Sequence, residues 1–137
     1  MADCPVLRCG DVVYMAKFPG ATPHPWVIVT EPNDNGEIAM VNITTPKSGS
    51  DMTVVLEANE HHRVTHRSVV YYQDARITLE EAVRGCVTNG LCIRCDPCSP
   101  EMLKKIQDGL PKSERTPKKV IAFLSWFSLK WRVAVFG

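Results

Sequence analysis

The first half of the chain alternates short apolar runs with polar turn segments. The apolar runs predict five β-strands, at residues 11–18, 26–30, 37–44, 52–57 and 64–72. The segments between them are rich in Pro, Gly, Asn and Asp, which favour tight turns. Five short strands with tight connections are typical of a small antiparallel β-barrel, whose closure leaves no exposed strand edge.

Beyond residue 75 the apolar positions recur at helical spacing. Residues 78–81 (TLEE) form a capping box. The helix that follows is expected to end between residues 85 and 90 and to bury Leu79, Ala82, Val83 and Cys86. The rest of the chain is therefore expected to be mostly helical.

Two further helix starts are visible closer to the C-terminus. Ser99 and Pro100 predict a helix that stops at Gly109 and buries Met102, Leu103 and Ile106. Residues 116–117 (TP) predict the start of a third helix, and residues 131–136 have the pattern of a last strand. The expected fold class is α+β, a small β-barrel at residues 10–77 with an appended C-terminal helical extension at residues 78–137.

The composition fits one globular domain of 137 residues, with 45% hydrophobic and 23% charged residues. A net charge of +1 gives no overall field that would attract nucleic acid or an anionic membrane. The charge is uneven, however, since residues 1–69 sum to −3 and residues 70–137 to +4. The sequence contains neither an export signal nor a membrane span, so we expect a soluble, cytoplasmic protein.

Residues suited to acid–base chemistry gather at the ends of the predicted strands. They are His24, Thr44, Thr45, Lys47, His61, His62, Arg63, His66, Arg67 and Ser68. A barrel brings loops from distant positions to one end, where imidazole can relay a proton and a basic side chain can stabilise phosphorane-like charge. These groups suffice for phosphodiester transesterification. Each residue alone also fits a structural role, because turn histidines are usually solvated and threonines often cap turns.

Four short motifs resemble, in order and spacing, the MazF/PemK toxins of toxin–antitoxin systems. They are residues 10–14 (GDVVY), 24–30 (HPWVIVT), 40–45 (MVNITT) and 68–70 (SVV), the last ahead of 75–77 (ARI). The resemblance covers about residues 10–80. It implies an SH3-like barrel, a homodimer, an inhibitory antitoxin partner, and metal-independent cleavage of single-stranded RNA.

The resemblance also implies roles for particular residues. Thr44 and Thr45 match the family's hydroxyl position at the end of the third strand, whereas His24 stands where the family has an arginine. An imidazole can act as acid or base, but it cannot clamp a phosphate in bidentate fashion as a guanidinium does. We therefore expect His24, Thr44 and Thr45 to be catalytic, with substrate-binding roles for Lys47, Arg63, His66 and Ser68.

Two alternatives to an enzyme remain open. The missing arginine and the near-neutral charge favour a non-catalytic interaction module on the same barrel. The chain could also be an adaptor whose C-terminal helices bind a protein. The helical tail contains basic and aromatic residues that could contact RNA or pack in the core. They are Lys112, Arg115, Lys118, Lys119, Trp126, Phe127, Lys130, Trp131 and Arg132.

Six cysteines in a chain without an export signal favour thiols or a metal over disulfides. Cys86, Cys92, Cys95 and Cys98 have spacings that would suit a structural zinc ion. Three closely spaced cysteines also resemble part of an iron–sulfur binding run, and buried cysteines serve equally as small apolar residues. The RNA chemistry itself requires no cofactor.

Overall fold

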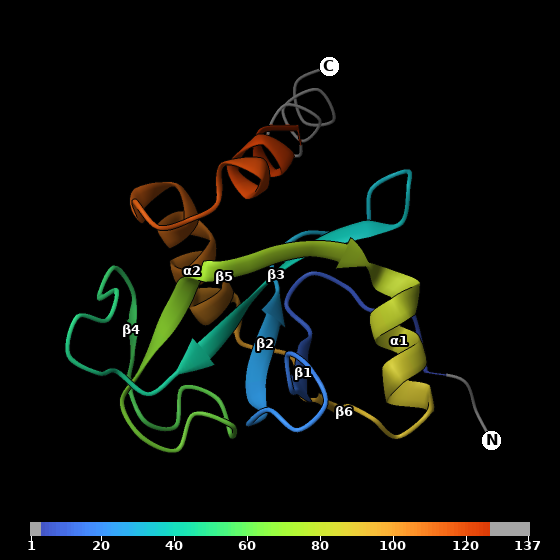
Figure 1. The fold of residues 1–137 in the computed structure, drawn as a ribbon, viewed down its shortest axis with the longest axis horizontal. Coiled ribbons are helices and arrows are strands. Elements are labelled where there is room, and N and C mark those ends of the chain that lie inside the picture. The colour runs from blue at the N-terminus through green and yellow to red at the C-terminus, as the bar shows by residue number, and fades with distance from the viewer. Residues whose placement is uncertain (1–3, 127–137) are drawn as a thin grey trace.

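The computed structural model describes residues 4–126, which form an α+β fold with a six-stranded antiparallel sheet (Figure 1). The elements in chain order are β1 (Val12–Met15), β2 (His24–Ile28), β3 (Glu37–Thr44), β4 (Val55–Leu56), β5 (Ser68–Leu79), α1 (Glu80–Thr88), β6 (Ile93–Cys95) and α2 (Pro100–Lys112). A further helix begins at residue 118. The strand predicted at residues 131–136 lies outside the described residues.

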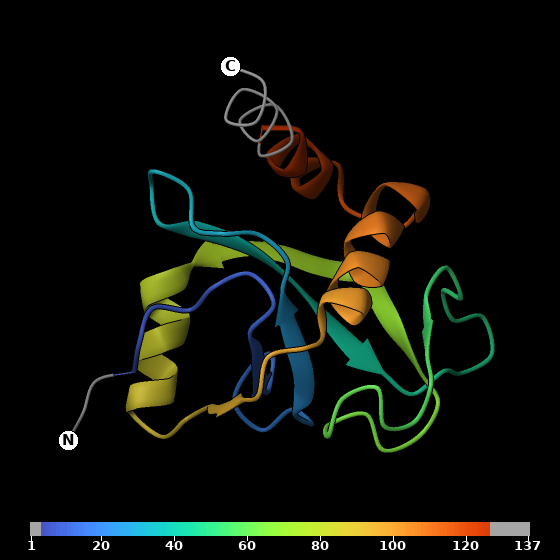
Figure 2. The ribbon, with the colours of Figure 1, turned by 180° about the vertical axis from the view of Figure 1, so that it is seen from behind.

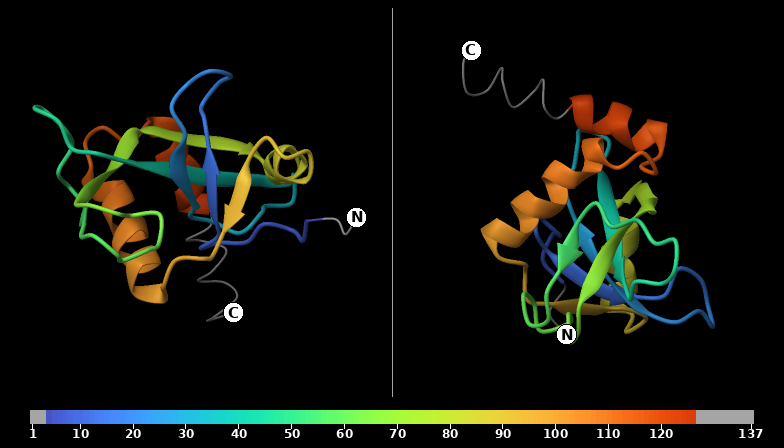
Figure 3. Two further views of the ribbon diagram at one scale, coloured as in Figure 1. Left: turned by 90° about the horizontal axis from the view of Figure 1, so that it is seen from below. Right: turned by 90° about the vertical axis from the view of Figure 1, so that its left-hand side faces the viewer.

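The strands are arranged in the order β4-β5-β3-β2-β1-β6, and the sheet is curled (Figure 3). Its edges are the two shortest strands, β4 and β6, which do not pair with each other. The sheet is therefore a half-barrel, and its edges are kept short instead of being closed on each other. Within residues 4–126, no helix is long and apolar enough to cross a membrane.

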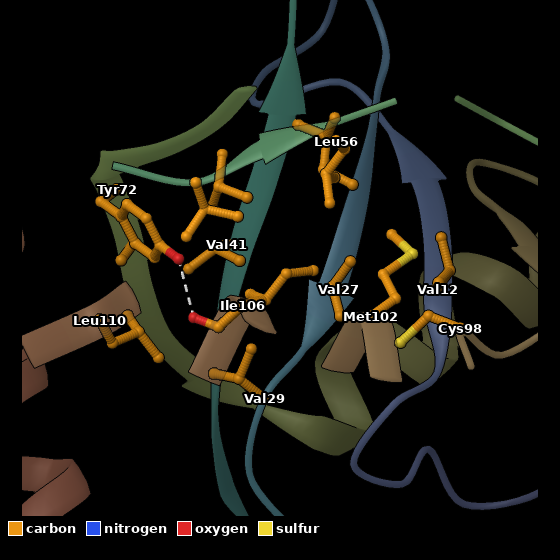
Figure 4. Close-up of a cluster of buried hydrophobic side chains, with 14 of the residues drawn as sticks. Val12, Val27, Val29, Val41, Leu56, Tyr72, Cys98, Met102, Ile106 and Leu110 are labelled. Carbon is orange, nitrogen blue, oxygen red and sulfur yellow. Dashed lines mark hydrogen bonds between the residues drawn. The ribbon is translucent and has the colours of Figure 1, made fainter. Parts of the chain in front are cut away.

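One face of the sheet carries the larger core, and α2 covers it. In Figure 2, α2 lies in front of the sheet, and the helix after it lies above the sheet in that view. Figure 4 shows Val27 and Val41 of the sheet facing Met102 and Ile106 of α2, all of them buried. The hydroxyl of Tyr72 donates a hydrogen bond of 2.8 Å to the Ile106 carbonyl oxygen. Each fully buried side chain of this kind contributes about 1.5–3 kcal/mol.

The predicted start of α2 is confirmed, but its predicted end is wrong. Ser99 is the N-cap, and its hydroxyl accepts a hydrogen bond from the Met102 N–H at 3.1 Å. The helix then continues through Gly109 to Lys112. A Cβ at Gly109 would collide with the hydroxyl of Tyr72 and with Val54. The glycine therefore allows close packing of helix on sheet and does not act as a stop signal.

The helix predicted after residue 78 forms, but it begins later and turns a different face inward. β5 runs on to Leu79, because Thr78 and Leu79 still pair with the start of β3. α1 then buries Val83, whereas Leu79 and Ala82 are exposed. Its first residue, Glu80, is buried and accepts a hydrogen bond of 2.8 Å from the Leu7 N–H, which fixes the N-terminal segment against the helix.

β6 is an element that the sequence pattern did not predict. It has three residues and pairs antiparallel with β1. The Arg94 guanidinium forms a salt bridge of 2.8 Å with the Asp11 carboxylate at the base of β1. A strand this short has no periodicity to recognise, so its position depends on contacts with a distant part of the chain.

Candidate functional site

The second face of the sheet has two halves of opposite chemistry. The apolar half consists of Val13, Trp26, Ile28, Ile38 and Met40, which are fully buried and pack with Leu7 of the N-terminal segment and with Val83 of α1. The polar half consists of His24, Asn42, Thr44, Tyr71 and Gln73. They occupy every second position on β2, β3 and β5, so their side chains share one face. The register pairs Trp26 with Asn42 and Asn42 with Tyr71, so the two halves meet at this row of residues.

A β-bulge in β5 lies at the boundary between the halves. Met40 pairs with Arg76 and Asn42 with Tyr71, so residues 72–75 of β5 lie opposite a single residue of β3. The bulge presents Asp74 to Asn42, whose Nδ2 donates to the Asp74 carboxylate at 3.5 Å. Bulges of this kind often re-aim side chains beside functional sites. At the same boundary, the Arg76 guanidinium lies over the Trp26 ring of the apolar half, 4.5 Å from its centroid.

A cavity of about 470 Å³ lies over the polar half of the face. Its lining comes from the loop after β1, from β2, β3 and β5, from the loop after β3 and from the turn after α2. The lining residues are Lys17, His24, Asn42, Thr44, Thr45, Lys47, Ser48, Gly49, Ser50, Tyr71, Gln73 and Arg115. Its volume is within the range of small-molecule sites. The three residues expected to be catalytic, His24, Thr44 and Thr45, thus meet in one cavity with Lys47.

The cavity is basic. Its lining includes Lys17, Lys47 and Arg115, and none of the described residues that line it is acidic. Lys17 is neutralised by a salt bridge to Asp74, and its burial, followed by the charge of Arg76, lowers its pKa. By contrast, the Lys47 ammonium and the Arg115 guanidinium form no salt bridge with any residue between Cys4 and Trp126. The cavity therefore offers two positive charges without a salt bridge in this part of the chain, although the Arg115 charge is close enough to Asp51 to help lower the pKa of that carboxyl.

Two polar groups of the cavity have no partner in the described part of the chain. The His24 ring forms no hydrogen bond there, so both of its nitrogens are available to a ligand. The Asn42 side chain is 1% exposed, and its carbonyl oxygen has no hydrogen-bond partner. A buried acceptor left unpaired costs about 1–3 kcal/mol of stability. Unpaired acceptors are therefore rare at positions with a purely structural role.

The remaining residues predicted to bind substrate divide into two groups. His66 and Ser68 are outside the cavity lining but connected to it: the exposed His66 has its Nε2 2.7 Å from the Thr45 hydroxyl, and the Ser68 hydroxyl donates to the His66 carbonyl oxygen at 2.9 Å. Arg63 is not part of the cavity lining. Its guanidinium lies over the Tyr14 ring, 4.2 Å from the centroid.

The structure does not bring the four predicted zinc ligands together. Cys92 packs in the core under α1, whereas Cys98 is buried in the core on the opposite face of the sheet. Cys95 packs on the same side as Cys98. Burial, and then the neighbouring Cys86 thiol, raise the pKa of Cys92 to about 11. Among residues 4–126 no three His, Cys, Asp or Glu side chains are grouped to hold a metal ion, and all six cysteines are free thiols.

Sequence reasoning did not assign Lys17, Asn42, Gln73 or Arg115 to the site. Asn42 had a detectable signal, because it lies two residues before Thr44 on a clearly alternating strand and so shares its face. Nothing in the sequence indicated that Arg115 lies beside the strand ends of the sheet. Its position depends on how α2 crosses the sheet.

Comparison with known proteins does not assign this site. No model of a known protein family matches the chain. Comparison with curated proteins gives no match either.

Proposed function

We propose that the protein is a metal-independent endoribonuclease that cleaves single-stranded RNA in the cavity on the polar half of the sheet. The observation that carries the proposal is the convergence of His24, Thr44, Thr45 and Lys47 in one basic cavity. An SH3-like barrel of the MazF/PemK type and its homodimer and antitoxin partner belong to the same proposal. They rest on the motifs at residues 10–80, because no family model supports them.

The proposed reaction is attack of a ribose 2′-hydroxyl on the adjacent phosphorus. His24 takes the proton of the 2′-hydroxyl as the new O2′–P bond forms, and the P–O5′ bond breaks. The departing 5′ oxygen takes a proton from water, which leaves a 2′,3′-cyclic phosphate and a 5′-hydroxyl. Thr44 and Thr45 donate hydrogen bonds to the non-bridging oxygens, and Lys47 stabilises the charge that develops on them. Arg63 has no part in this scheme, because its guanidinium lies over Tyr14.

A second function on the same cavity is RNA binding without cleavage. It is favoured by the His24 ring, since no carboxylate within the described residues orients it as an efficient general base usually requires. This function differs from the first only in the fate of the bound RNA. It is one form of the non-catalytic interaction module that the sequence left open.

The test is cleavage of a mixed-sequence, end-labelled single-stranded RNA at neutral pH in EDTA. The unmodified protein should produce fragments ending in 2′,3′-cyclic phosphate, and His24→Ala should be at least about a hundredfold slower. His62→Ala is the matched control, because the His62 side chain is half exposed and lies outside the cavity. Equal cleavage by the protein and His24→Ala would contradict the proposal. Binding without cleavage would favour the second function.

A further inference from the structure

We propose that Arg115 is a phosphate-binding residue of the cavity, so that the C-terminal extension completes a site otherwise built by the sheet. The inference rests on the proposed function for its RNA substrate and deepens it. It assigns the fixed positive charge of the site to a residue outside the segment that resembles the toxin family.

Arg115 differs from the other arginines that the structure describes. Four of them form salt bridges with carboxylates: Arg8, Arg67, Arg84 and Arg94. Arg63 and Arg76 lie over aromatic rings. Within residues 4–126, only the Arg115 guanidinium has neither kind of partner, and it lines a cavity without acidic residues. A guanidinium is permanently charged and matches two phosphate oxygens at once, which a lysine or histidine cannot do.

A buried hydrogen-bond network holds Arg115 beside the cavity. Its backbone N–H donates to the Ser113 hydroxyl at 3.2 Å, and that hydroxyl donates to the Asp51 carboxylate. Asp51 also accepts a hydrogen bond of 2.9 Å from the Thr53 N–H. Ser113 and Asp51 are each 7% exposed. The network therefore joins the turn after α2 to the loop after β3, and both of these segments line the cavity.

The far end of the same turn is also fixed. The Thr116 hydroxyl donates a hydrogen bond of 2.7 Å to the Leu110 carbonyl oxygen in the last turns of α2. Thr116 is 8% exposed, so this contact is shielded from water. A turn held at both ends loses little further freedom when a ligand binds, which increases the affinity that one arginine can supply.

The first arm of the test measures RNA affinity. A fluorescent 2′-O-methyl RNA, which lacks the attacking hydroxyl, is titrated with the full-length protein at several salt concentrations. Arg115→Ala should bind about tenfold more weakly, and the slope of log affinity against log salt should fall by about 0.7, the value for one phosphate contact with a single strand. Arg115→Lys should recover part of the loss. Lys112→Ala, an equal charge change on an exposed residue outside the cavity lining, should leave the slope unchanged.

The second arm separates this inference from the proposed function. Potassium phosphate is titrated against potassium chloride at equal ionic strength, while the NMR signal of the Arg115 Nε–H is followed. If the protein neither binds nor cleaves RNA but phosphate shifts this signal saturably, the ribonuclease proposal fails and the role of Arg115 stands. If RNA binds with the same affinity and salt slope to Arg115→Ala, the role of Arg115 is overturned while the proposed function stands. Absence of both phosphate shifts and RNA binding overturns both.

Discussion

The two halves of the second sheet face are built by the same strands, yet only one is covered. Trp26 and Met40 lie under α1 on the apolar half, whereas His24 and Thr44, two residues from Trp26 and four from Met40 along the same strands, line an open cavity. The β5 bulge marks the boundary. The fold therefore separates the residues that stabilise it from the residues available for chemistry on a single surface. Side chains of the apolar half should matter for folding, and those of the polar half for RNA.

The largest expected effect is on the apolar half. Trp26→Ala removes the largest fully buried side chain of the face and should lower the free energy of unfolding by about 3–5 kcal/mol. Gln73→Ala, an exposed residue of the polar half, should change it by less than about 0.5 kcal/mol. Urea denaturation measures both. Equal destabilisation by the two substitutions would remove the distinction between the halves.

The next effect is on the polar half and concerns cleavage. Thr44→Val removes the hydroxyl of a residue that lines the cavity while keeping the shape of the side chain, and it should slow RNA cleavage by about ten- to a hundredfold. The matched control is Thr88→Val on α1, whose hydroxyl donates to the Arg84 carbonyl oxygen away from the cavity. Single-turnover cleavage rates at one pH suffice. A slower rate in both variants would indicate a general loss of structure.

A smaller effect concerns the network that fixes the cavity wall. Burial raises the pKa of Asp51, but hydrogen bonds from Ser113 and Thr53 and the charge of Arg115 lower it more, so the pKa is below its usual value. The ionised carboxylate therefore stabilises the fold above its unfolded pKa of 3.8, and this contribution is lost as the pH falls through the folded pKa.

Asp51→Asn should accordingly lower the free energy of unfolding by about 1–3 kcal/mol at pH 7. The difference from the unmodified protein should shrink as the pH is taken below about 4. Asp96→Asn, at a side chain that is 89% exposed, is the control and should behave like the unmodified protein. A deficit for Asp51→Asn that is equal at pH 7 and pH 3 would show that its charge is not the cause.

The smallest effect is expected at the Lys17–Asp74 salt bridge. Both side chains are partly exposed, so Lys17→Met should cost at most about 1 kcal/mol of stability. The substitution leaves the Asp74 carboxylate uncompensated beside the cavity, and RNA affinity should fall for that reason. Thermal unfolding and RNA titration of the same variant measure the two quantities. Unchanged RNA affinity would place the RNA away from this corner of the cavity.

The sequence predicted the main strands and the start of α2 because their signals are local. Apolar alternation marks β3, and the Ser99–Pro100 pair marks the helix start. The end of β3, with Thr44, Thr45 and Lys47, lies beside the start of β2, which carries His24. A small antiparallel sheet is expected to bring such strand ends together, so this convergence could be predicted. The extent of β5, the inward face of α1 and the short strand β6 depend on pairing with distant residues. No local pattern encodes such contacts.

Arg115 illustrates the limit of sequence reasoning most clearly. The residue was visible as part of a basic tail, but its place beside the loop after β3 depends on the packing of α2 over the sheet and on the Asp51–Ser113 hydrogen bond. Arg63 illustrates the converse case. Its place in a loop predicts a residue that balances phosphate charge, and in the structure its guanidinium lies over the Tyr14 ring, outside the cavity lining.

The most direct test of the account is to map where RNA binds. Backbone amide signals of the full-length protein are followed by NMR while a non-cleavable 2′-O-methyl RNA is added. The account predicts saturable shifts at His24, at residues 44–50, at Gln73 and at Arg115, with signals of α1 unchanged. Shifts concentrated on α1 or β6, with the cavity residues unaffected, would contradict the claim that the polar half of the sheet is the functional site.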